Sequence, residues 1–234
     1  SSVQQTDTSD TNLNITTNTW SDTIEITRIV QASSGNGDLI QAMQNPAAYD
    51  RSVDGKNGSI LNGGNGADTL RGLGGWDIFD GGSGNDLIHG GNGRDIIDGG
   101  SGADELHGDF GWNTYKDERD GSKDLIAIKS DQHLSNWWYG QSGNSPNGEK
   151  ADFIEGLDTY DEIKIIGAMT ADLTFADGVT ARGATGIGIY AEGTLEAVYT
   201  GGDLSVSQIQ SMTTGDGSAA AMNNEVWSYW GDNT

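Results

Sequence analysis

The sequence predicts an all-β fold of short stacked parallel strands with flanking β-rich regions, and three observations lead to this prediction. From Gly63 to Lys116 the chain reads as six consecutive nine-residue units without an insertion. Positions 1 and 4 of every unit are glycine, and position 8 is always a large apolar or aromatic residue. The whole chain holds 37 glycines but only 2 prolines, which indicates a repeated backbone geometry rather than a flexible linker.

Each unit is expected to form half a coil. The glycines allow the chain to turn, and the residues after them form a short strand with only position 8 pointing into the core. Two units then make one coil of 18 residues, and successive coils stack at the strand spacing of about 4.8 Å. Residues 54–62 keep the spacing without the aspartate and are expected to form a degenerate first turn.

Position 6 is expected to hold metal ligands. Stacking predicts one ladder of Asp68, Asp86 and Asp104 and a second ladder of Asp77, Asp95 and Asn113. Carboxylates about 5 Å apart repel one another without a cation, whereas calcium prefers six to eight oxygens at about 2.3–2.6 Å and magnesium needs a smaller octahedral cage. Further ligands are expected from the glycine loops, at Gly63, Gly64, Asn65, Gly66, Gly72, Leu73, Gly74, Gly75, Gly81, Gly82, Ser83, Gly84, Gly90, Gly91, Asn92, Gly93, Gly99, Gly100, Ser101, Gly102, Gly108, Asp109 and Gly111.

The six units resemble the RTX (hemolysin-type) calcium-binding nonapeptide, GGxGxDxUx. This resemblance implies a calcium-bound parallel β-roll that holds several calcium ions. Residues 151–167 resemble the segment that follows the repeats in secreted RTX proteins, which implies that Asp152 and Asp161 ligate calcium at the end of the roll. The alternative is that both are solvated loop acids. Residues 154–212 are similar to the tail of cyanobacterial secreted RTX-type proteins.

Four regions follow from these patterns. They are an N-terminal polar and strand segment at 1–53, the β-roll at 54–116, a roll-closing cap at 117–167, and a small β-rich C-terminal module and tail at 168–234. Strands outside the repeats are expected at 23–30, 124–131, 172–176, 186–191 and 194–200. A short helix is expected at 205–212, with Ser205 or Ser207 as its N-cap.

Composition and motifs exclude several function classes. The formal net charge is −23, from 35 acidic and 12 basic residues, which disfavours nucleic-acid binding. The chain has no cysteine and no apolar run of 18 residues, so neither thiolate sites nor a membrane span is predicted. HExxH, GxSxG and phosphate-loop motifs are absent, and an enzyme is not predicted. His89 and His107 share position 9. They could bind a transition metal such as zinc, but the favoured interpretation is that both are exposed strand residues.

Two surfaces suggest partners. Position 7 is expected to face outward, yet Ile78 and Ile96 stack there, and such an apolar row needs the N-terminal strand, the C-terminal module or a second copy as its partner. The open ends of the roll also favour self-association. The aromatic run at 137–139 either binds a glycan or packs over the open end of the roll.

The sequence therefore predicts a secreted, non-enzymatic calcium-binding protein with a structural or surface role in adhesion, a sheath or a self-assembling filament. The resemblance to RTX proteins implies that it leaves a bacterium unfolded through a one-step secretion channel. It would then fold on extracellular calcium, at an extracellular or cell-surface location. One alternative is the C-terminal RTX module of a larger secreted enzyme. The other is a carbohydrate-binding module.

Overall fold

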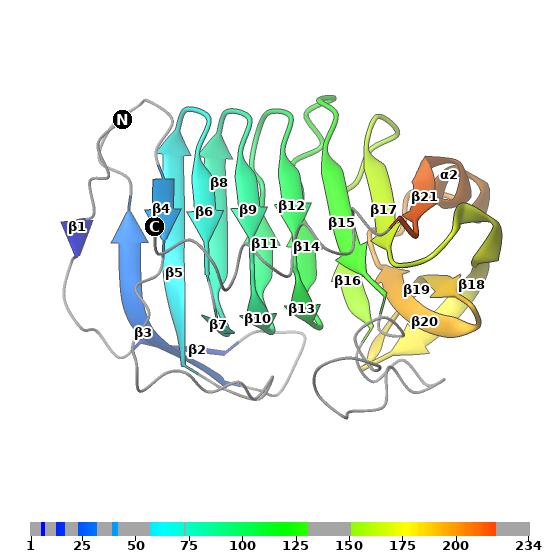
Figure 1. The fold of residues 1–234 in the computed structure, drawn as a ribbon, viewed down its shortest axis with the longest axis horizontal. Helices are drawn as coiled ribbons and strands as arrows, with labels where there is room; N and C mark the ends of the chain where they lie inside the picture. Colours follow the sequence, from blue (N-terminus) through cyan, green and yellow to red (C-terminus); the bar gives the residue numbers. More distant parts are fainter. Residues whose placement is uncertain are drawn as a thin grey trace.

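Two walls of parallel strands stack along the long axis of the molecule (Figure 1). The computed structural model describes residues 57–72, 74–130 and 151–218, together with four N-terminal strands. The first wall, called wall A, consists in spatial order of β3 (Thr23–Gln31), β5 (Asn57–Asn65), β8 (Ile78–Ser83), β11 (Ile96–Asp98), β14 (Thr114–Lys116), β16 (Asp152–Ile154) and β20 (Thr194–Tyr199). Opposite lies wall B, with β4 (Leu39–Gln41), β6 (Thr69–Arg71), β9 (Leu87–His89), β12 (Glu105–His107), β15 (Leu125–Lys129), β17 (Glu162–Ile166) and β21 (Thr213–Asp216).

The register of the walls confirms the predicted 18-residue coil. Ile78 pairs with Ile96, and Leu87 pairs with Glu105, each in parallel with a partner one coil further on. A third sheet joins β7 (Gly74–Gly75), β10 (Asn92–Gly93) and β13 (Phe110–Gly111) at the turns between the walls. The all-β parallel β-roll with flanking β-rich regions is therefore the fold of this chain.

The core of the roll is a column of position 8 side chains. In β6, β9, β11 and β14 only the central residue is buried, because neighbouring side chains point to opposite faces of a strand. The column continues beyond the repeats into the cap, and its members are at most 1% exposed: Leu61, Leu70, Phe79, Ile88, Ile97, Leu106, Tyr115, Ile126, Ile154 and Ile163. Leu61, the first of these residues, lies in the segment 54–62, so this degenerate unit contributes to the column although β3 and β4 precede it in the walls.

The N-terminal strand predicted at 23–30 is present as β3 and extends wall A. It pairs in parallel with β5, and β1 (Thr6–Asp7) and β2 (Leu13–Thr16) pair with it in antiparallel fashion. Because it adds to the end of the wall by backbone pairing, it continues the coil.

The C-terminal elements close the opposite end of both walls. The strands predicted at 124–131, 172–176, 186–191 and 194–200 are found as β15, β18 (Leu173–Ala181), β19 (Ala184–Ala191) and β20. The helix is α2 (Val206–Met212), and Ser205 is its N-cap with a reciprocal capping box to Gln208. A short 3-10 helix η1 (Thr170–Asp172) precedes β18.

The parallel pairing of β20 with β16 and of β21 with β17 was not predicted. Through these pairs both walls continue across the expected boundary at 167/168.

Trp76 packs on the outer face of wall A. Ile60, Ile78 and Ile96 are half-buried there against Trp76, which is only 4% exposed. The guanidinium carbon of Arg94 lies 4.2 Å from the Trp76 ring centroid and 5.2 Å from that of Trp112. Trp76, Arg94 and Trp112 share position 5 of alternate units. The roll therefore covers its own apolar row, and this partner was not among those predicted.

Candidate calcium sites

Ladder A is a row of side chains at the start of the strands of wall A. The backbone N–H of Asp77 donates to Oδ1 of Asp95 at 2.8 Å, and that of Asp95 donates to Oδ1 of Asn113 at 2.9 Å. At the far end, the N–H of Asn113 donates to Oδ1 of Asp152 at 2.5 Å. Asp152 therefore lies in the ladder and is 5% exposed, so it is not the solvated loop acid of the alternative interpretation.

Ladder B runs along the start of the strands of wall B. The N–H of Asp68 donates to Oδ1 of Asp86 and the N–H of Asp86 donates to Oδ1 of Asp104, each at 2.7 Å. The row then continues past the repeats, with Asp104 N–H to Asp124 Oδ1 at 2.6 Å and Asp124 N–H to Asp161 Oδ1 at 3.2 Å. Asp161 is 4% exposed. The two predicted ladders are thus present, and the structure lengthens both.

The second carboxylate oxygen of four repeat aspartates has no protein donor. Oδ2 is buried without a hydrogen-bond partner among the described residues in Asp77, Asp86, Asp95 and Asp104. A buried carboxylate oxygen without a donor is costly. Burial raises the pKa values of Asp77 and Asp95 well above the ordinary value for aspartate. The nearby Asp95 carboxylate raises the pKa of Asp77 further. A cation between the coils would offset both the burial and the repulsion.

The glycine loops bring carbonyl oxygens to the same place. A Cβ on Gly81 would lie 2.6 Å from Oδ2 of Asp86 and closer still to the carbonyl oxygen of Gly99. Gly84 adopts a φ of +142°, and a Cβ there would overlap the carbonyl oxygen of Gly66 one coil away. Only glycine allows this approach. Carboxylate and carbonyl oxygens from two coils are the donor set that calcium prefers, so these residues fit the ion.

The last glycine loop differs from the others. Asp109 replaces a glycine at a φ of 60°, and its carboxylate lies 3.4 Å from His89 Nδ1 and 3.4 Å from Lys129 Nζ. Burial raises its pKa, but Lys129 and His89 outweigh burial and hold the pKa of Asp109 below the ordinary value. Its carboxylate is thereby engaged on the side of wall B, so only its carbonyl remains for a calcium ion. In the same loop the N–H of Gly108 donates to the Tyr115 hydroxyl at 2.9 Å.

His89 and His107, which share position 9 of alternate units, stack ring on ring. Their ring centroids are 4.6 Å apart with an interplanar angle of 17°. His107 is buried at 8% exposure, contrary to the expected surface position, and its Nε2 lies 2.7 Å from Oε1 of Glu105. Ring stacking and these acidic neighbours account for both side chains without a transition metal.

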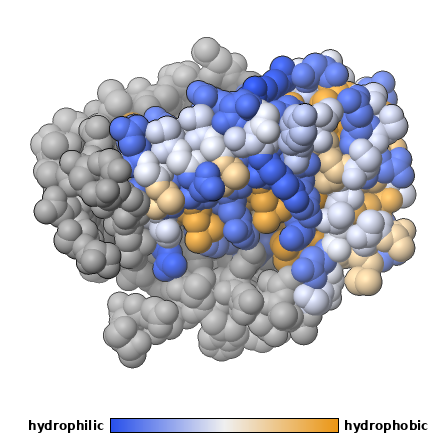
Figure 2. Space-filling model, turned by 90° about the horizontal axis from the view of Figure 1, so that it is seen from above, coloured by the Kyte–Doolittle hydropathy of each residue, from blue (hydrophilic) through white to orange (hydrophobic). Residues whose placement is uncertain are grey.

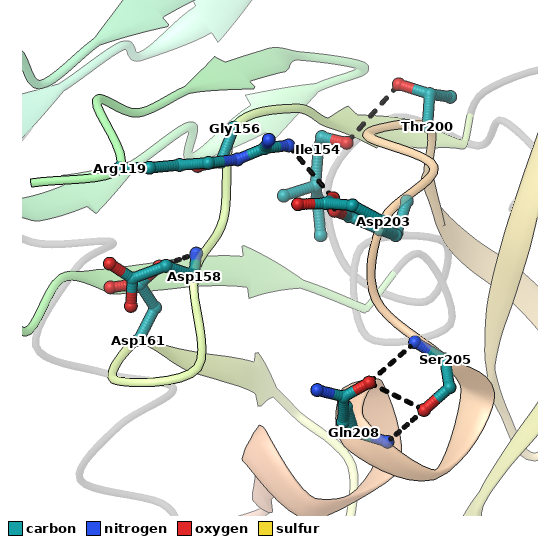
Figure 3. Close-up of polar contacts among 10 residues, drawn as sticks. Arg119, Ile154, Gly156, Asp158, Asp161, Thr200, Asp203, Ser205 and Gln208 are labelled. Carbon is teal, nitrogen blue, oxygen red and sulfur yellow. Dashed lines mark hydrogen bonds and ion pairs between the residues drawn. The ribbon is translucent and has the colours of Figure 1, made fainter. Parts of the chain in front are cut away.

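Asp161 is held by its own loop as well as by the ladder. Its Oδ2 accepts the N–H of Asp158 at 2.6 Å, so both of its oxygens accept backbone donors. Next to it Arg119 donates to the carbonyl of Gly156 at 3.2 Å and to Asp203 at 2.9 Å (Figure 3). These contacts tie the cap loop to the C-terminal elements at the end of ladder B.

Asp117 and Asp124 are acidic residues of this region that the sequence analysis missed. Asp124 follows Asp104 by 20 residues rather than 18, because the loop after Lys116 has two extra residues. One signal was available: residues 156–164, GLDTYDEIK, keep glycine at position 1, aspartate at position 6 and isoleucine at position 8. Asp161 is the position 6 residue of this unit, and Asp124 lies between Asp104 and Asp161 in ladder B. Asp124 is therefore the position 6 residue of the intervening coil.

Comparison with known proteins agrees with this geometry. Residues 54–88 and 80–115 match the RTX calcium-binding nonapeptide repeat (4 copies). No curated protein and no solved structure matches the chain. The fold and the two ladders define a calcium-binding β-roll protein. More particularly, the chain carries RTX, or hemolysin-type, calcium-binding repeats, and its cofactor is Ca²⁺.

Proposed function

We propose that the protein is a secreted, non-enzymatic calcium-binding protein with a structural or surface role, and that its roll folds when it meets extracellular calcium. The observation that carries the proposal is the pair of ladders, in which carboxylates are buried one above another. Four of these aspartates have an oxygen without a hydrogen-bond donor among the described residues. A ladder of this kind repels itself at neutral pH, and the net charge of −23 adds to the repulsion. Calcium binding then supplies folding free energy.

Secretion fits the class of repeat and the chemistry of the roll. RTX repeats are typical of secreted proteins. In the cytosol, where calcium is scarce, the ladders would stay unpaired and the chain unfolded, which suits export through a narrow channel. In the part of the chain that the structure describes, no helix has the length and apolarity needed to cross a membrane.

A surface role is supported by the outside of the molecule. Hydrophilic residues dominate the described face in Figure 2, and hydrophobic residues lie between them in small groups. At one end, β18 is the last strand of its sheet and offers nine residues of strand edge. An unpaired edge of that length is a site for pairing with another chain, which would serve a sheath or filament. The aromatic run at 137–139, the basis of the glycan proposal, lies outside the described residues.

Far-ultraviolet circular dichroism tests calcium-dependent folding. We expect EGTA to remove the β signal at neutral pH, and added calcium to restore it. Magnesium at the same concentration is the control and should restore little, because the ligand set is large and rich in carbonyls. A spectrum that EGTA leaves unchanged would refute calcium-driven folding.

Electron microscopy tests the assembly role separately. The protein at high concentration in calcium should form ordered assemblies that dissolve in EGTA. Monomers alone under these conditions would leave the calcium-folded roll intact but contradict a sheath or filament.

A further inference from the structure

Three carboxylates meet at the cap end of ladder B. One oxygen each from Asp104, Asp117 and Asp124 lies within 4.8 Å of the other two. Asp104 belongs to the last repeat of the ladder, whereas Asp117 and Asp124 lie beyond residue 115, where the match to the repeat ends. Among the described residues, this is the one group of three acidic or histidine side chains with such spacing.

Two of the three side chains are fully buried, and the third, Asp117, is half-buried. Asp104 is 2% exposed and Asp124 is 1% exposed. Both carboxylate oxygens of Asp117 and Oδ2 of Asp104 are buried without a hydrogen-bond donor among the described residues. Water solvates the oxygens of an exposed acidic cluster, but these oxygens of Asp104 and Asp117 are buried. Buried oxygens without donors point to a missing cation.

No basic side chain of the same loop serves as that cation. Lys123 Nζ lies 3.0 Å from Glu162, and Arg119 lies 2.9 Å from Asp203. Both cations are therefore engaged away from the cluster. Burial, followed by the charges of Asp124 and Asp161, raises the pKa of Asp117 to about 9, which agrees with a carboxylate that lacks a counter-charge.

The loop that presents Asp117 departs from the repeat pattern. Asp117 directly follows the strand β14, where the other units place their position 1 glycine. Gly156, the position 1 residue one coil further on, adopts a φ of +84° and packs so closely on the Asp117 carbonyl that a Cβ would overlap it. The next coil thus closes over Asp117 and holds its side chain beside the ladder.

We propose that Asp104, Asp117 and Asp124 form a calcium site of their own at the junction of roll and cap, distinct in composition from the repeat sites. Each repeat site draws on two position 6 side chains, whereas this one adds a third carboxylate from position 1. Calcium affinity rises with the number of charged ligands and with the rigidity of the site. The junction site is therefore the tightest of the molecule and locks the cap onto the roll.

The inference rests on the calcium-folded roll but not on its surface role. The test is calorimetric titration of the full chain with Ca²⁺, which resolves the tightest binding step from the weaker repeat steps. Asp117→Asn keeps the shape and removes the charge, and we expect it to weaken the tightest step by about tenfold or more. The matched control is Glu118→Gln, which removes an exposed charge from the same loop and should leave that step unchanged.

The outcomes separate this site from the proposed function. A tightest step that is unchanged in Asp117→Asn, or reduced equally in Glu118→Gln, would overturn the junction site while the repeat steps persist. Loss of every calcium step in the parent chain would instead refute the calcium-folded roll.

Crystals of the parent chain grown with Tb³⁺ provide a measurement that does not depend on how a variant folds. We expect an anomalous peak between Asp104, Asp117 and Asp124. Peaks in the repeats with none at the junction would overturn the proposal.

Discussion

The repeats at 63–116 and the cap that follows them build the same ladder from different sequences. In the repeats, Asp86 and Asp104 are 18 residues apart and joined through a 2.7 Å hydrogen bond. In the cap, Asp104 and Asp124 are 20 residues apart, yet the corresponding bond is 2.6 Å. The comparison shows that the bond between one backbone N–H and the next carboxylate defines the ladder, while the loop between them tolerates insertion.

The largest effect is expected from a methyl group in a repeat loop. Gly84→Ala would place a Cβ onto the Gly66 carbonyl oxygen at a φ that L-residues rarely adopt, so calcium should no longer induce the full β signal in circular dichroism. The matched variant in the C-terminal module is Gly178→Ala, at a φ of +67° with open space around it, which should cost only about 1–2 kcal/mol. Equal losses in thermal unfolding would show that backbone strain, not the close approach of coils, governs both regions.

The next effect concerns pH in the absence of calcium. Burial raises the pKa of Asp104 to about 7 and that of Asp117 to about 9, above the ordinary value of about 3.9 in an unfolded chain. The folded state then binds more protons, so the stability of the calcium-free roll should fall as pH rises from about 4 to about 9. With calcium present the trend reverses, because protons compete with the ion.

Far-ultraviolet circular dichroism of the protein freed of calcium by dialysis, compared at pH 5 and pH 8, checks this sign, and we expect more β signal at pH 5. A calcium-free roll that is more stable at pH 8 would contradict the raised pKa values and the picture of uncompensated carboxylates.

A smaller effect is expected in the core column. Ile97→Ala removes a side chain that is 0% exposed and should lower the free energy of unfolding in calcium by about 2–5 kcal/mol. Ile96→Ala, one residue earlier and half-buried against Trp76, should cost clearly less. Chemical denaturation in saturating calcium measures both variants, and a larger loss for Ile96→Ala would mean that the outer face stabilises the roll more than its interior.

The smallest effect belongs to the C-terminal helix. Ser205→Ala removes the N-cap of α2 and should cost about 1 kcal/mol, with no change in calcium affinity because α2 contributes nothing to the ladders. Ser207→Ala, at the other cap that the sequence allowed, is the control and should be near neutral. A calcium affinity altered by Ser205→Ala would show that the C-terminal helix and the calcium sites are energetically coupled.

Periodicity explains which parts of this molecule were predictable. The six position 6 residues of the repeats were placed correctly in two ladders. Residues 18 positions apart lie one above another when the coils stack, so a constant spacing predicts which side chains meet. Asp124 was missed because two inserted residues shift it out of register. Trp76 and Arg94 were missed for another reason: they occupy position 5, where the repeat has no fixed residue type, so no pattern marks their stacking.

The sequence by itself determined the coil, its core column and the calcium-binding chemistry of the repeats, because those depend on residues a fixed number of positions apart. Only the tertiary structure decided that Asp117 and Asp124 meet Asp104, that Asp109 faces His89 and Lys129, and that β20 and β21 continue the walls. The contacts of Asp117, Asp124 and Lys129 and the pairing of β20 and β21 join segments separated by irregular loops, whereas Asp109 stands where most repeat units have a glycine. Spacing along the chain does not set distance there, and packing against the end of the roll does.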